Sequence, residues 1–428
     1  MFAVGIIITL VFFFMGSPIF VAMGIGSAIL SLLAFGISPG AIASFFIESI
    51  NSFTMLAIPL FIFMGDLFLK SGSSKHLLTF IRVYFGNIKA GMGIATVVAS
   101  AFFGAISGSS VACIAAIGSI MAPVMFSQNY NRGTTAGLIA CSGAIGNLIP
   151  PSIFMILYGA LLELNVATLF AAGLIPGLIT GGLLCVTITL LMRKKEVSPL
   201  PPEAKKAKRR IFINALPTLI MPIIVLGGIY GGVFTPTEAA AVGTVYTIIV
   251  GFLIYRELNL KKLWKSLTDS LVIISSIFLL GAGAILIGRM FVLAGVPQAM
   301  SEFVVRANLS AASFLVLACG MMLVMGVFIE VLIILLVFVP IVYPSVLMLG
   351  INPIYFGIIV VISLLIGQAT PPVATNLYAS SLICNVPPQE TARGITPFTL
   401  TLIVSLVITV AFPGLSLWLP RILGLPIK

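Results

Sequence analysis

Residues 367–376 read GQATPPVATN, and this stretch interrupts a strongly apolar part of the chain. The run IIVVISLLI (358–366) precedes it, and the run LYASSLI (377–383) follows it. Two adjacent prolines remove two backbone donors and crowd the carbonyls of the preceding turn, so a regular helix cannot continue through them. The stretch therefore predicts a helix that is broken in its middle.

The composition of the chain defines the surroundings of this break. Of the 428 residues, 60% are hydrophobic and only 8% are charged, and the mean hydropathy is +1.25. A water-soluble chain of this length needs far more charge to cover its surface. Apolar runs of roughly 15–30 residues recur along the chain, and such runs are long enough to span a lipid bilayer. We therefore expect an all-α integral membrane protein without a separate soluble domain.

The reactive side chains argue against an enzyme. The five cysteines lie in or beside apolar segments without a CxxC spacing, and the single histidine, His76, is not part of a metal-binding motif. The sequence contains no phosphate-binding GxxxxGK[ST] motif and no HExxH motif. We expect no enzymatic activity and no organic cofactor, so the energy for any uphill transport must come from elsewhere.

Basic residues cluster in the connections between apolar runs and indicate the orientation of the chain. The largest cluster, RKKEVSPLPPEAKKAKRR at 193–210, contains eight Lys or Arg residues, and the connections at 70–89 and 256–265 are also basic. Because cytoplasmic loops of membrane proteins are enriched in Lys and Arg, we place all three in the cytoplasm. The net charge of +11 is explained in this way, and we expect no nucleic acid partner.

This orientation predicts a path through the membrane. The first half crosses or enters it at 2–15, 18–35, 51–69, 90–126, 134–162 and 168–192. The second half does so at 211–233, 238–255, 267–293, 311–348, 353–383 and 396–419. The segments 90–126 and 311–348 must enter and return on the same side, as re-entrant hairpins. In this layout 18 of the 22 basic residues lie in cytoplasmic connections and both termini lie outside.

The chain contains an internal repeat. The stretch GNLIPPS (146–152) matches GQATPPV (367–373) in its glycine and in both prolines, at a separation of 221 residues. Each half crosses the membrane an odd number of times, so the halves have opposite orientations. We therefore expect an inverted-topology repeat, with halves at 1–192 and 211–428 that are joined by the cytoplasmic linker 193–210.

Two broken helices at matching positions, 134–162 and 353–383, indicate a transporter. An unsatisfied backbone group in hydrocarbon costs several kcal/mol, so such breaks persist only against protein, water or a bound ion. In inverted repeats, breaks of this kind surround a substrate and ion site near the midplane of the membrane. The alternative is that the prolines only kink two packed helices, which does not explain why both halves carry them.

The predicted hairpins turn at GAISGSS (104–110) and MGVFIE (325–330). The three hydroxyls of the first tip suit a cation or a carboxylate, although small residues also allow close helix packing. Glu330, in the second tip, is costly in a membrane unless it is paired or hydrated, so it is a candidate functional residue. A structural hydrogen bond from the broken backbone to Glu330 is an equally good interpretation.

Two charged residues, Asp66 and Arg289, occupy equivalent positions of the repeat, beside Gly65 and Gly288. Arg289 could meet an anionic substrate, but near the outer end of a crossing it can also extend to the membrane surface. We interpret both side chains as structural.

Four stretches resemble the large membrane subunit of a tripartite ATP-independent periplasmic (TRAP) transporter. They are GAISGSSVACIAAIGSIMAPVM (104–125), GNLIPPSIFMILYG (146–159), GGVFTPTEAAAVG (231–243) and GQATPPVATNLY (367–378). The resemblance implies a secondary transporter that imports a small organic acid, such as a C4-dicarboxylate or sialic acid, with sodium. It also implies an elevator mechanism, in which the hairpins and broken helices move against a fixed scaffold. Proton coupling, or a passive channel, is the alternative function.

The resemblance also implies partners and a location. A small membrane subunit of about four helices, expected as a separate chain, and a periplasmic substrate-binding protein would act with this chain. The location would be the bacterial inner membrane, with both termini in the periplasm.

By the same resemblance, sodium is the coupling ion and binds at the tips and breaks. The expected sodium-binding residues are Ser107, Gly108, Ser109, Ser110, Gly146, Asn147, Gly326, Gly367, Thr370 and Pro371. The expected substrate-binding residues are Ser110, Asn147, Gln368, Asn376 and Glu330.

Overall fold

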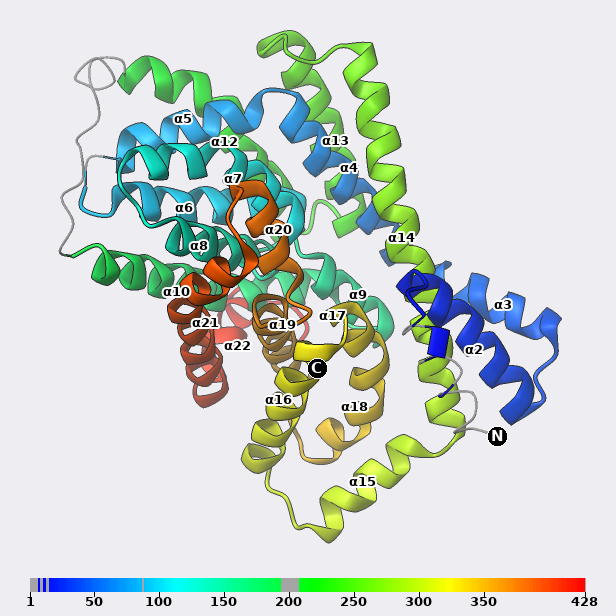
Figure 1. Ribbon diagram of the computed structural model, residues 1–428. Helices are drawn as coiled ribbons and strands as arrows, with labels where there is room; N and C mark the ends of the chain where they lie inside the picture. Colours follow the sequence, from blue (N-terminus) through cyan, green and yellow to red (C-terminus); the bar gives the residue numbers. More distant parts are fainter. Residues whose placement is uncertain (1–6, 8–10, 13–14, 87, 194–207, 428) are drawn as a thin grey trace.

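The computed structural model describes residues 7, 11–12, 15–86, 88–193 and 208–427, which form helices joined by short connections (Figure 1). Most of the predicted crossing at 2–15 and most of the linker 193–210 lie outside these residues. Eight helices in the described part of the chain are long and apolar enough to span a membrane, or nine if the bent pair Pro39–Ile50 and Thr54–Lys70 forms one span. The predicted all-α membrane fold is confirmed.

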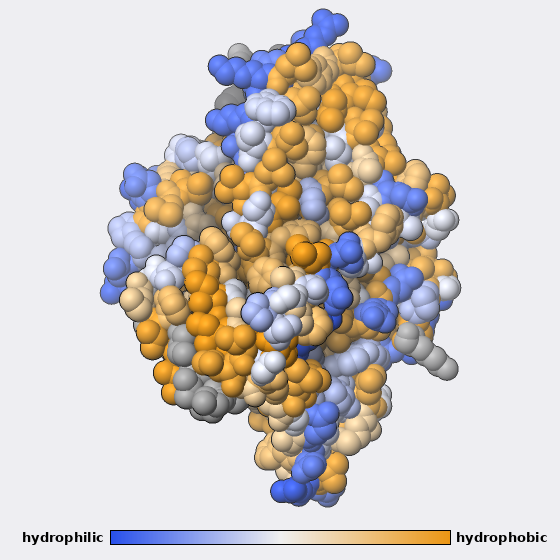
Figure 2. Space-filling model, turned by 90° about the vertical axis from the view of Figure 1, so that its right-hand side faces the viewer, coloured by the Kyte–Doolittle hydropathy of each residue, from blue (hydrophilic) through white to orange (hydrophobic). Residues whose placement is uncertain are grey.

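The surface agrees with a membrane environment. Figure 2 shows a face on which apolar residues cover large areas, with hydrophilic residues at its upper and lower ends and in smaller groups between them. Large exposed side chains on the long helices include Leu178, Ile223 and Val272, which are 59%, 69% and 69% exposed. Such side chains are stable on a surface that faces lipid rather than water.

The helices of the first half follow one another along the chain with short breaks. They are α2 (Ile19–Phe35), α3 (Pro39–Ile50), α4 (Ala57–Lys70), α5 (Ser73–Phe85), α6 (Gly91–Ser107), α7 (Ser110–Ser127), α8 (Arg132–Ala144), α9 (Ile153–Leu161) and α10 (Val166–Leu191). Two short 3₁₀ helices, η1 (Thr54–Leu56) and η2 (Ile145–Asn147), precede α4 and follow α8.

The second half begins with α12 (Lys208–Tyr230), which corresponds to the crossing predicted at 2–15, most of which lies outside the described residues, and it then repeats the order of the first half. Its other helices are α13 (Pro236–Ile249), α14 (Leu260–Leu293), α15 (Val296–Arg306), α16 (Ala311–Phe328), α17 (Val331–Ile333), α18 (Val339–Met348), α19 (Pro353–Ala369), α20 (Thr375–Cys384), α21 (Pro388–Ala411) and α22 (Gly414–Ile422). Two π-helical turns, η3 (Val250–Ile254) and η4 (Ile334–Phe338), continue α13 and join α17 to α18.

Equivalent elements of the two halves share local details. α6 and α7 form one hairpin, and α16 with the segment from α17 to α18 forms the other. The broken helices are α8–α9 and α19–α20, and in each break the peptide bond between the two prolines is cis, at Pro150–Pro151 and Pro371–Pro372. The short helices α5 and α15 both begin after a glycine with positive φ, +85° at Gly72 and +74° at Gly295.

Polar side chains define where several helices begin. Asn131, Asn165, Asn259 and Ser310 each accept a hydrogen bond from a backbone N–H in the first turn of the following helix. Thr235 and Glu238 form a reciprocal capping box at the start of α13. These caps satisfy backbone donors that have no partner inside the helix.

Some predicted boundaries were wrong. The segments 70–89 and 294–310 are not simple connections, because α5 and α15 occupy most of them. Both helices are amphipathic and too polar to cross a membrane, and Figure 1 shows them at opposite ends of the molecule.

Three crossings are also displaced from their predicted positions. The crossing predicted at 51–69 is a bent pair that begins with α3, at an angle of 63°. α14 begins at Leu260 rather than at 267. The final crossing, predicted at 396–419, is α21 from Pro388 to Ala411, and α22 is a separate helix.

α19 is the central helix of the fold. Every residue from Ile354 to Ala369 is buried, and α16, α21 and α10 pack around it. The helix is apolar on all its faces, which is the pattern of a helix surrounded by protein. The break that follows it is therefore held inside the molecule, where its backbone groups can meet other backbone groups.

Candidate functional site

Each helix break lies against the tip of the hairpin from its own half. In the first half, the N–H of Ile153 donates to the carbonyl of Gly108, at 3.4 Å. In the second half, the N–H of Val373 donates to the carbonyl of Val327, at 3.2 Å. The two breaks are thus held to the two tips by similar backbone hydrogen bonds, and part of the backbone freed by the prolines is satisfied in this way.

The approach of hairpin and broken helix depends on glycine. A methyl group added to Gly104 would lie 2.2 Å from the Cα of Gly146, and one added to Gly326 would lie 2.8 Å from the Cα of Gly367. These distances are too short for any side chain. Both pairs are related by the repeat, so the same backbone contact is made in each half.

The side chains at the two breaks meet at the amide oxygen of Gln368. This oxygen accepts hydrogen bonds from Ser110 Oγ at 3.3 Å, from Asn147 Nδ2 at 3.5 Å and from Asn376 Nδ2 at 3.4 Å. Ser110 and Asn147 belong to the first half, whereas Gln368 and Asn376 belong to the second. We call these four residues the amide cluster, and each of them is at most 6% exposed.

Helix N-termini surround the amide cluster. The side chains of Ser109 and Ser152 cap α7 and α9, and Asn147 Oδ1 accepts from the N–H of Ser110 at 3.1 Å. Within the cluster's neighbourhood, α20 begins without a side-chain cap. Because the N-terminus of a helix carries a partial positive charge, this arrangement favours an anion.

Two oxygens at the start of α20 have no hydrogen-bond partner among the described residues. They are Asn376 Oδ1 and Thr375 Oγ1, and both atoms are buried. A buried polar atom without a partner costs about 1–3 kcal/mol, and such atoms often mark a site for a ligand, ion or water. The amide cluster therefore has unused acceptor capacity on the side of α20.

The sequence matches the Tripartite ATP-independent periplasmic transporter family, DctM component, over residues 6–415. The chain belongs to the DctM family. It is 36% identical to the C4-dicarboxylate TRAP transporter large permease protein DctM of Pseudomonas aeruginosa, over 94% of this chain and 95% of that protein. It is 30% identical to the sialic acid TRAP transporter large permease protein SiaM of Vibrio cholerae, over 87% of each.

A solved structure has a similar fold. The crystal structure of the YdaH transporter of Alcanivorax borkumensis, described as having an unusual topology, matches 94% of this chain and 98% of that chain with a TM-score of 0.63. The sequence identity is 12%, so this likeness concerns the fold alone. As a DctM-family chain, the protein is a multi-pass membrane permease of a TRAP transporter, and it is not an enzyme.

Four of the five substrate-binding residues predicted for this DctM-family chain lie together, because they form the amide cluster. The fifth, Glu330, does not bond to it. Its carboxylate caps α17 by accepting from the N–H of Leu332 at 2.6 Å, which agrees with the structural interpretation of this residue.

The predicted sodium-binding residues are arranged around the two tips and the two breaks. Gly146 and Gly367 directly precede Asn147 and Gln368 of the amide cluster. The hydroxyl of Ser107 donates to the carbonyl of Ser109 at 3.4 Å, and the hydroxyl of Thr370 donates to the carbonyl of Ile366 at 2.7 Å. The side chain of Pro371 is exposed at the break.

Two site residues, Ser152 and Thr375, were missed from the sequence. Ser152 caps α9, and its hydroxyl also donates to the carbonyl of Asn147. Its position gave a usable signal, because a serine just after a helix break is typical of an N-cap. Thr375 is the first residue of α20 and follows the N-cap residue Ala374, which makes no side-chain cap bond.

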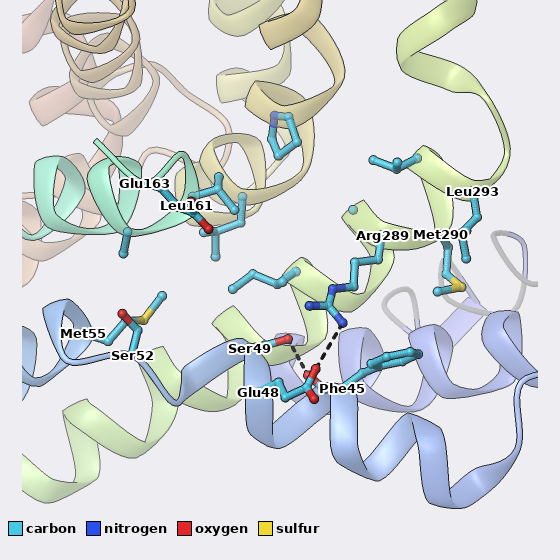
Figure 3. A pocket seen from close by; sticks show the side chains of 16 residues that line it. Phe45, Glu48, Ser49, Ser52, Met55, Leu161, Glu163, Arg289, Met290 and Leu293 are labelled. Carbon is cyan, nitrogen blue, oxygen red and sulfur yellow. Dashed lines mark hydrogen bonds and ion pairs between the residues drawn. The ribbon is translucent and has the colours of Figure 1, made fainter. Parts of the chain in front are cut away.

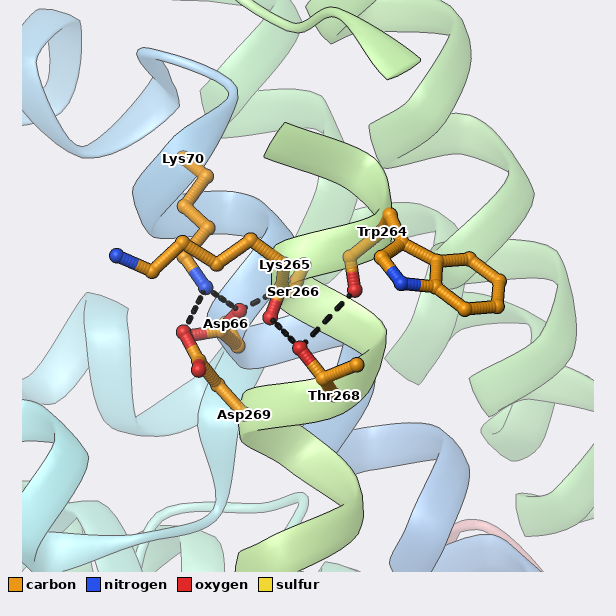
Figure 4. A network of polar contacts seen from close by, with 7 residues as sticks. All are labelled: Asp66, Lys70, Trp264, Lys265, Ser266, Thr268 and Asp269. Carbon is orange, nitrogen blue, oxygen red and sulfur yellow. Dashed lines mark hydrogen bonds and ion pairs between the residues drawn. The ribbon is translucent and has the colours of Figure 1, made fainter. Parts of the chain in front are cut away.

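The two charged residues beside Gly65 and Gly288 have different surroundings. Arg289 pairs with Glu48 of α3 at 3.6 Å and lines a cavity (Figure 3). Asp66 accepts from Lys70 at 2.7 Å and from Ser266, and Lys70 also pairs with Asp269 of α14 at 2.6 Å (Figure 4). The Asp66 network joins α4 to α14, as its structural interpretation requires, whereas Arg289 also faces open space.

Proposed function

We propose that this DctM-family chain imports a small organic acid together with sodium ions. The single observation that carries the proposal is the amide cluster, in which Gln368 of one half accepts hydrogen bonds from Ser110 and Asn147 of the other. In an inverted repeat, this is the location at which broken helices surround a substrate and its coupling ion.

The chemistry of the amide cluster supports the pairing of an anion with a cation. Its hydrogen bonds in the described part of the chain involve neutral groups, so no basic side chain of the cluster balances a substrate carboxylate. The helix N-termini balance part of that charge, and sodium, bound by backbone and side-chain oxygens, would balance more. Each ion would therefore bind more tightly when the other is present, which is the requirement for coupled transport.

The hydrogen bonds at Gln368 also suit a site that exchanges partners. They measure 3.3–3.5 Å, which is longer than the usual 2.7–3.2 Å. A ligand that replaces Gln368 as the acceptor would exchange a weak bond for a stronger one. The cost of opening the amide cluster to substrate is therefore small.

For the movement, we propose that the hairpins α6–α7 and α16–α18 move with the broken helices α8–α9 and α19–α20. We call these four elements the moving part, and we call α2–α4 and α12–α14 the scaffold. The backbone bonds between tips and breaks support this division, because they tie each hairpin to a broken helix. A small membrane subunit, expected as a separate chain, and a periplasmic binding protein complete the transporter in this proposal.

The relatives suggest the class of substrate. One is described as a C4-dicarboxylate permease and another as a sialic acid permease, and both compounds are small carboxylic acids. Uptake of succinate and of sialic acid should therefore be measured in proteoliposomes that contain this chain with its two partners. We expect uptake of one of them under an inward sodium gradient and little uptake when potassium replaces sodium.

Two results would contradict the proposal. Uptake that follows an inward proton gradient without sodium would show proton coupling, for which Glu330 at the second hairpin tip is the carboxylate to test, as Glu330→Gln. Electrical currents in the absence of the binding protein would show a passive channel instead.

A further inference from the structure

A cavity of about 500 Å³ lies between the scaffold and the moving part, and no residue of the amide cluster lines it (Figure 3). Its scaffold wall comes from α3, the connection to α4 and the C-terminal end of α14, including Glu48, Ser52 and Arg289. Its opposite wall comes from the end of α9 and from the second hairpin, at Leu336 and Pro340. A volume of this size is typical of small-molecule sites.

Arg289 is held in this cavity with donors to spare. Its guanidinium lies over the ring of Phe45, 4.9 Å from the ring centre, and one nitrogen lies 3.6 Å from Glu48 Oε2. That separation is longer than a hydrogen bond, and the Arg289 side chain is 44% exposed. A guanidinium carries five N–H donors in a planar fork that matches a carboxylate, so most of its binding capacity is unused here.

The neighbouring carboxylates determine how such a site can work. Glu48 is 60% exposed, and Glu163 enters from the opposite wall just beyond α9 (Figure 3). An incoming carboxylate must therefore displace Glu48 from Arg289, and the remaining negative charge weakens its binding. Weak binding suits an entry site, because a site that holds its ligand tightly does not pass it on.

The walls of the cavity connect it to the moving part. Gly288, next to Arg289, lies against the second hairpin, because a methyl group on it would be 3.2 Å from the carbonyl oxygen of Leu336. Leu336 is six residues from Glu330 at the tip of that hairpin. The cavity thus adjoins the hairpin that reaches the second break, at the end of the molecule where α14 leads into α15.

We propose that this cavity is an entry site for small carboxylates, in which Arg289 binds the carboxylate after Glu48 has swung away. The inference rests on the proposed import of an organic acid, and it adds a second site on the substrate's path. It also assigns a functional role to Arg289, in place of the purely structural role inferred from the sequence.

The experiment measures anion binding in the cavity directly, without transport. Ser52 lines the cavity and is exposed, so Ser52→Cys provides a thiol there. We would measure its rate of modification by an anionic and by a cationic methanethiosulfonate, with and without succinate. The variants Arg289→Gln and Glu48→Gln would each be combined with Ser52→Cys.

The two variants should act in opposite directions. Succinate should slow modification of the Ser52→Cys protein, Arg289→Gln should abolish this protection, and Glu48→Gln should lower the succinate concentration required. The anionic reagent should lose rate relative to the cationic one in Arg289→Gln and gain in Glu48→Gln. A simple loss of structure would change the modification rates and the protection by succinate in the same direction in both variants.

A matched control uses another arginine and glutamate pair. Arg306 and Glu302, on α15, pair at 2.9 Å and are 81% and 64% exposed, outside the cavity. Arg306→Gln and Glu302→Gln should leave protection by succinate unchanged. The inference is overturned if succinate still protects Arg289→Gln, or if protection is lost equally in Glu48→Gln. It is also overturned if succinate does not protect the Ser52→Cys protein itself. Protection with no uptake of any acid would instead contradict the proposed function alone.

Discussion

At the scale of single residues, the amide oxygen of Gln368 is the acceptor that joins the two halves. In Gln368→Leu, three buried donors lose this acceptor, at a cost of about 1–3 kcal/mol for each donor that remains unpaired. We expect a lower unfolding temperature for the purified protein and loss of sodium-dependent uptake.

The control for this substitution is another buried glutamine. The amide oxygen of Gln128, at the end of α7, is buried and has no hydrogen-bond partner in the part of the chain that the structure describes. Gln128→Leu removes no acceptor in use, so it should leave both the unfolding temperature and uptake nearly unchanged. Equal losses in the two variants would show that the bonds at Gln368 have no special importance.

His76 gives the chain a dependence of stability on pH. Its ring stacks on Tyr255 with ring centres 4.2 Å apart, and burial lowers the pKa of His76 from its usual 6.5, against the opposing effect of Glu257. The unfolded chain therefore takes up a proton more readily than the folded one. Stability should be complete above about pH 6.5 and should fall as the pH drops from there toward the lower pKa of the folded state.

His76→Phe tests this expectation, because phenylalanine retains a ring against Tyr255 but takes up no proton. The unfolding temperature of the variant should fall less than that of the parent between pH 7 and pH 5. Parallel curves for the two proteins would exclude a contribution from His76.

The repeat allowed most residues of the amide cluster to be predicted, whereas the roles of Glu330 and Thr375 depend on local backbone geometry. Asn147 and Gln368 are equivalent positions, 221 residues apart, so the sequence already pairs them. Glu330 lies 221 residues after Ser109, and both side chains cap the second helix of their hairpin. The carboxylate binds its own helix because of the backbone geometry at that tip, which residue type alone does not indicate. The unpaired oxygen of Thr375 likewise depends on the conformation of one break, which sequence spacing does not reveal.

At the scale of secondary-structure elements, the contact between α16 and α19 depends on Gly326. Gly326→Ala would bring a methyl group within 2.8 Å of the Cα of Gly367, so hairpin and broken helix must separate. Gly320, on the same helix, has open space around it. Gly320→Ala should therefore be neutral or stabilising by up to about 1 kcal/mol, from helix propensity alone.

Unfolding temperatures and sodium-dependent uptake would compare the two alanine variants. We expect Gly326→Ala to lower both and Gly320→Ala to lower neither. If Gly326→Ala transports normally, the contact is more adaptable than the described geometry indicates.

Some long apolar helices, such as α10 and α12, were predicted from the sequence within three residues, whereas α5 and α15 were not predicted as helices. An apolar run must be buried in lipid or in a protein core, so its length alone indicates a helix. α5 contains Lys75, His76 and Arg82, and a polar amphipathic helix of this kind looks like a loop when hydropathy is the main criterion. It becomes helical because α6 and α12 pack against its apolar face.

At the scale of the whole molecule, the distribution of basic residues makes a prediction about orientation. Lys261, at the start of α14, should face the cytoplasm, and Arg306, at the end of α15, should face the periplasm. In intact cells, a thiol reagent that cannot cross the inner membrane should modify Arg306→Cys and leave Lys261→Cys unmodified.

The native cysteines provide a low background for this measurement. Cys113, Cys141, Cys319 and Cys384 are buried and Cys185 is partly buried, so the reagent should react slowly with the parent protein. Modification of Lys261→Cys from outside would contradict the predicted orientation, and with it the proposed direction of import.

The length of α14 has a consequence for how the protein sits in its membrane. With 34 residues it is about 51 Å long, whereas the hydrocarbon layer is about 30 Å thick. Its first two turns carry Trp264, which is 68% exposed, between Lys261, Lys262 and Lys265. An indole ring settles among lipid headgroups and ammonium groups remain in water. This one helix would thereby fix the immersion depth of the protein, and with it the depth at which every other helix lies in the bilayer.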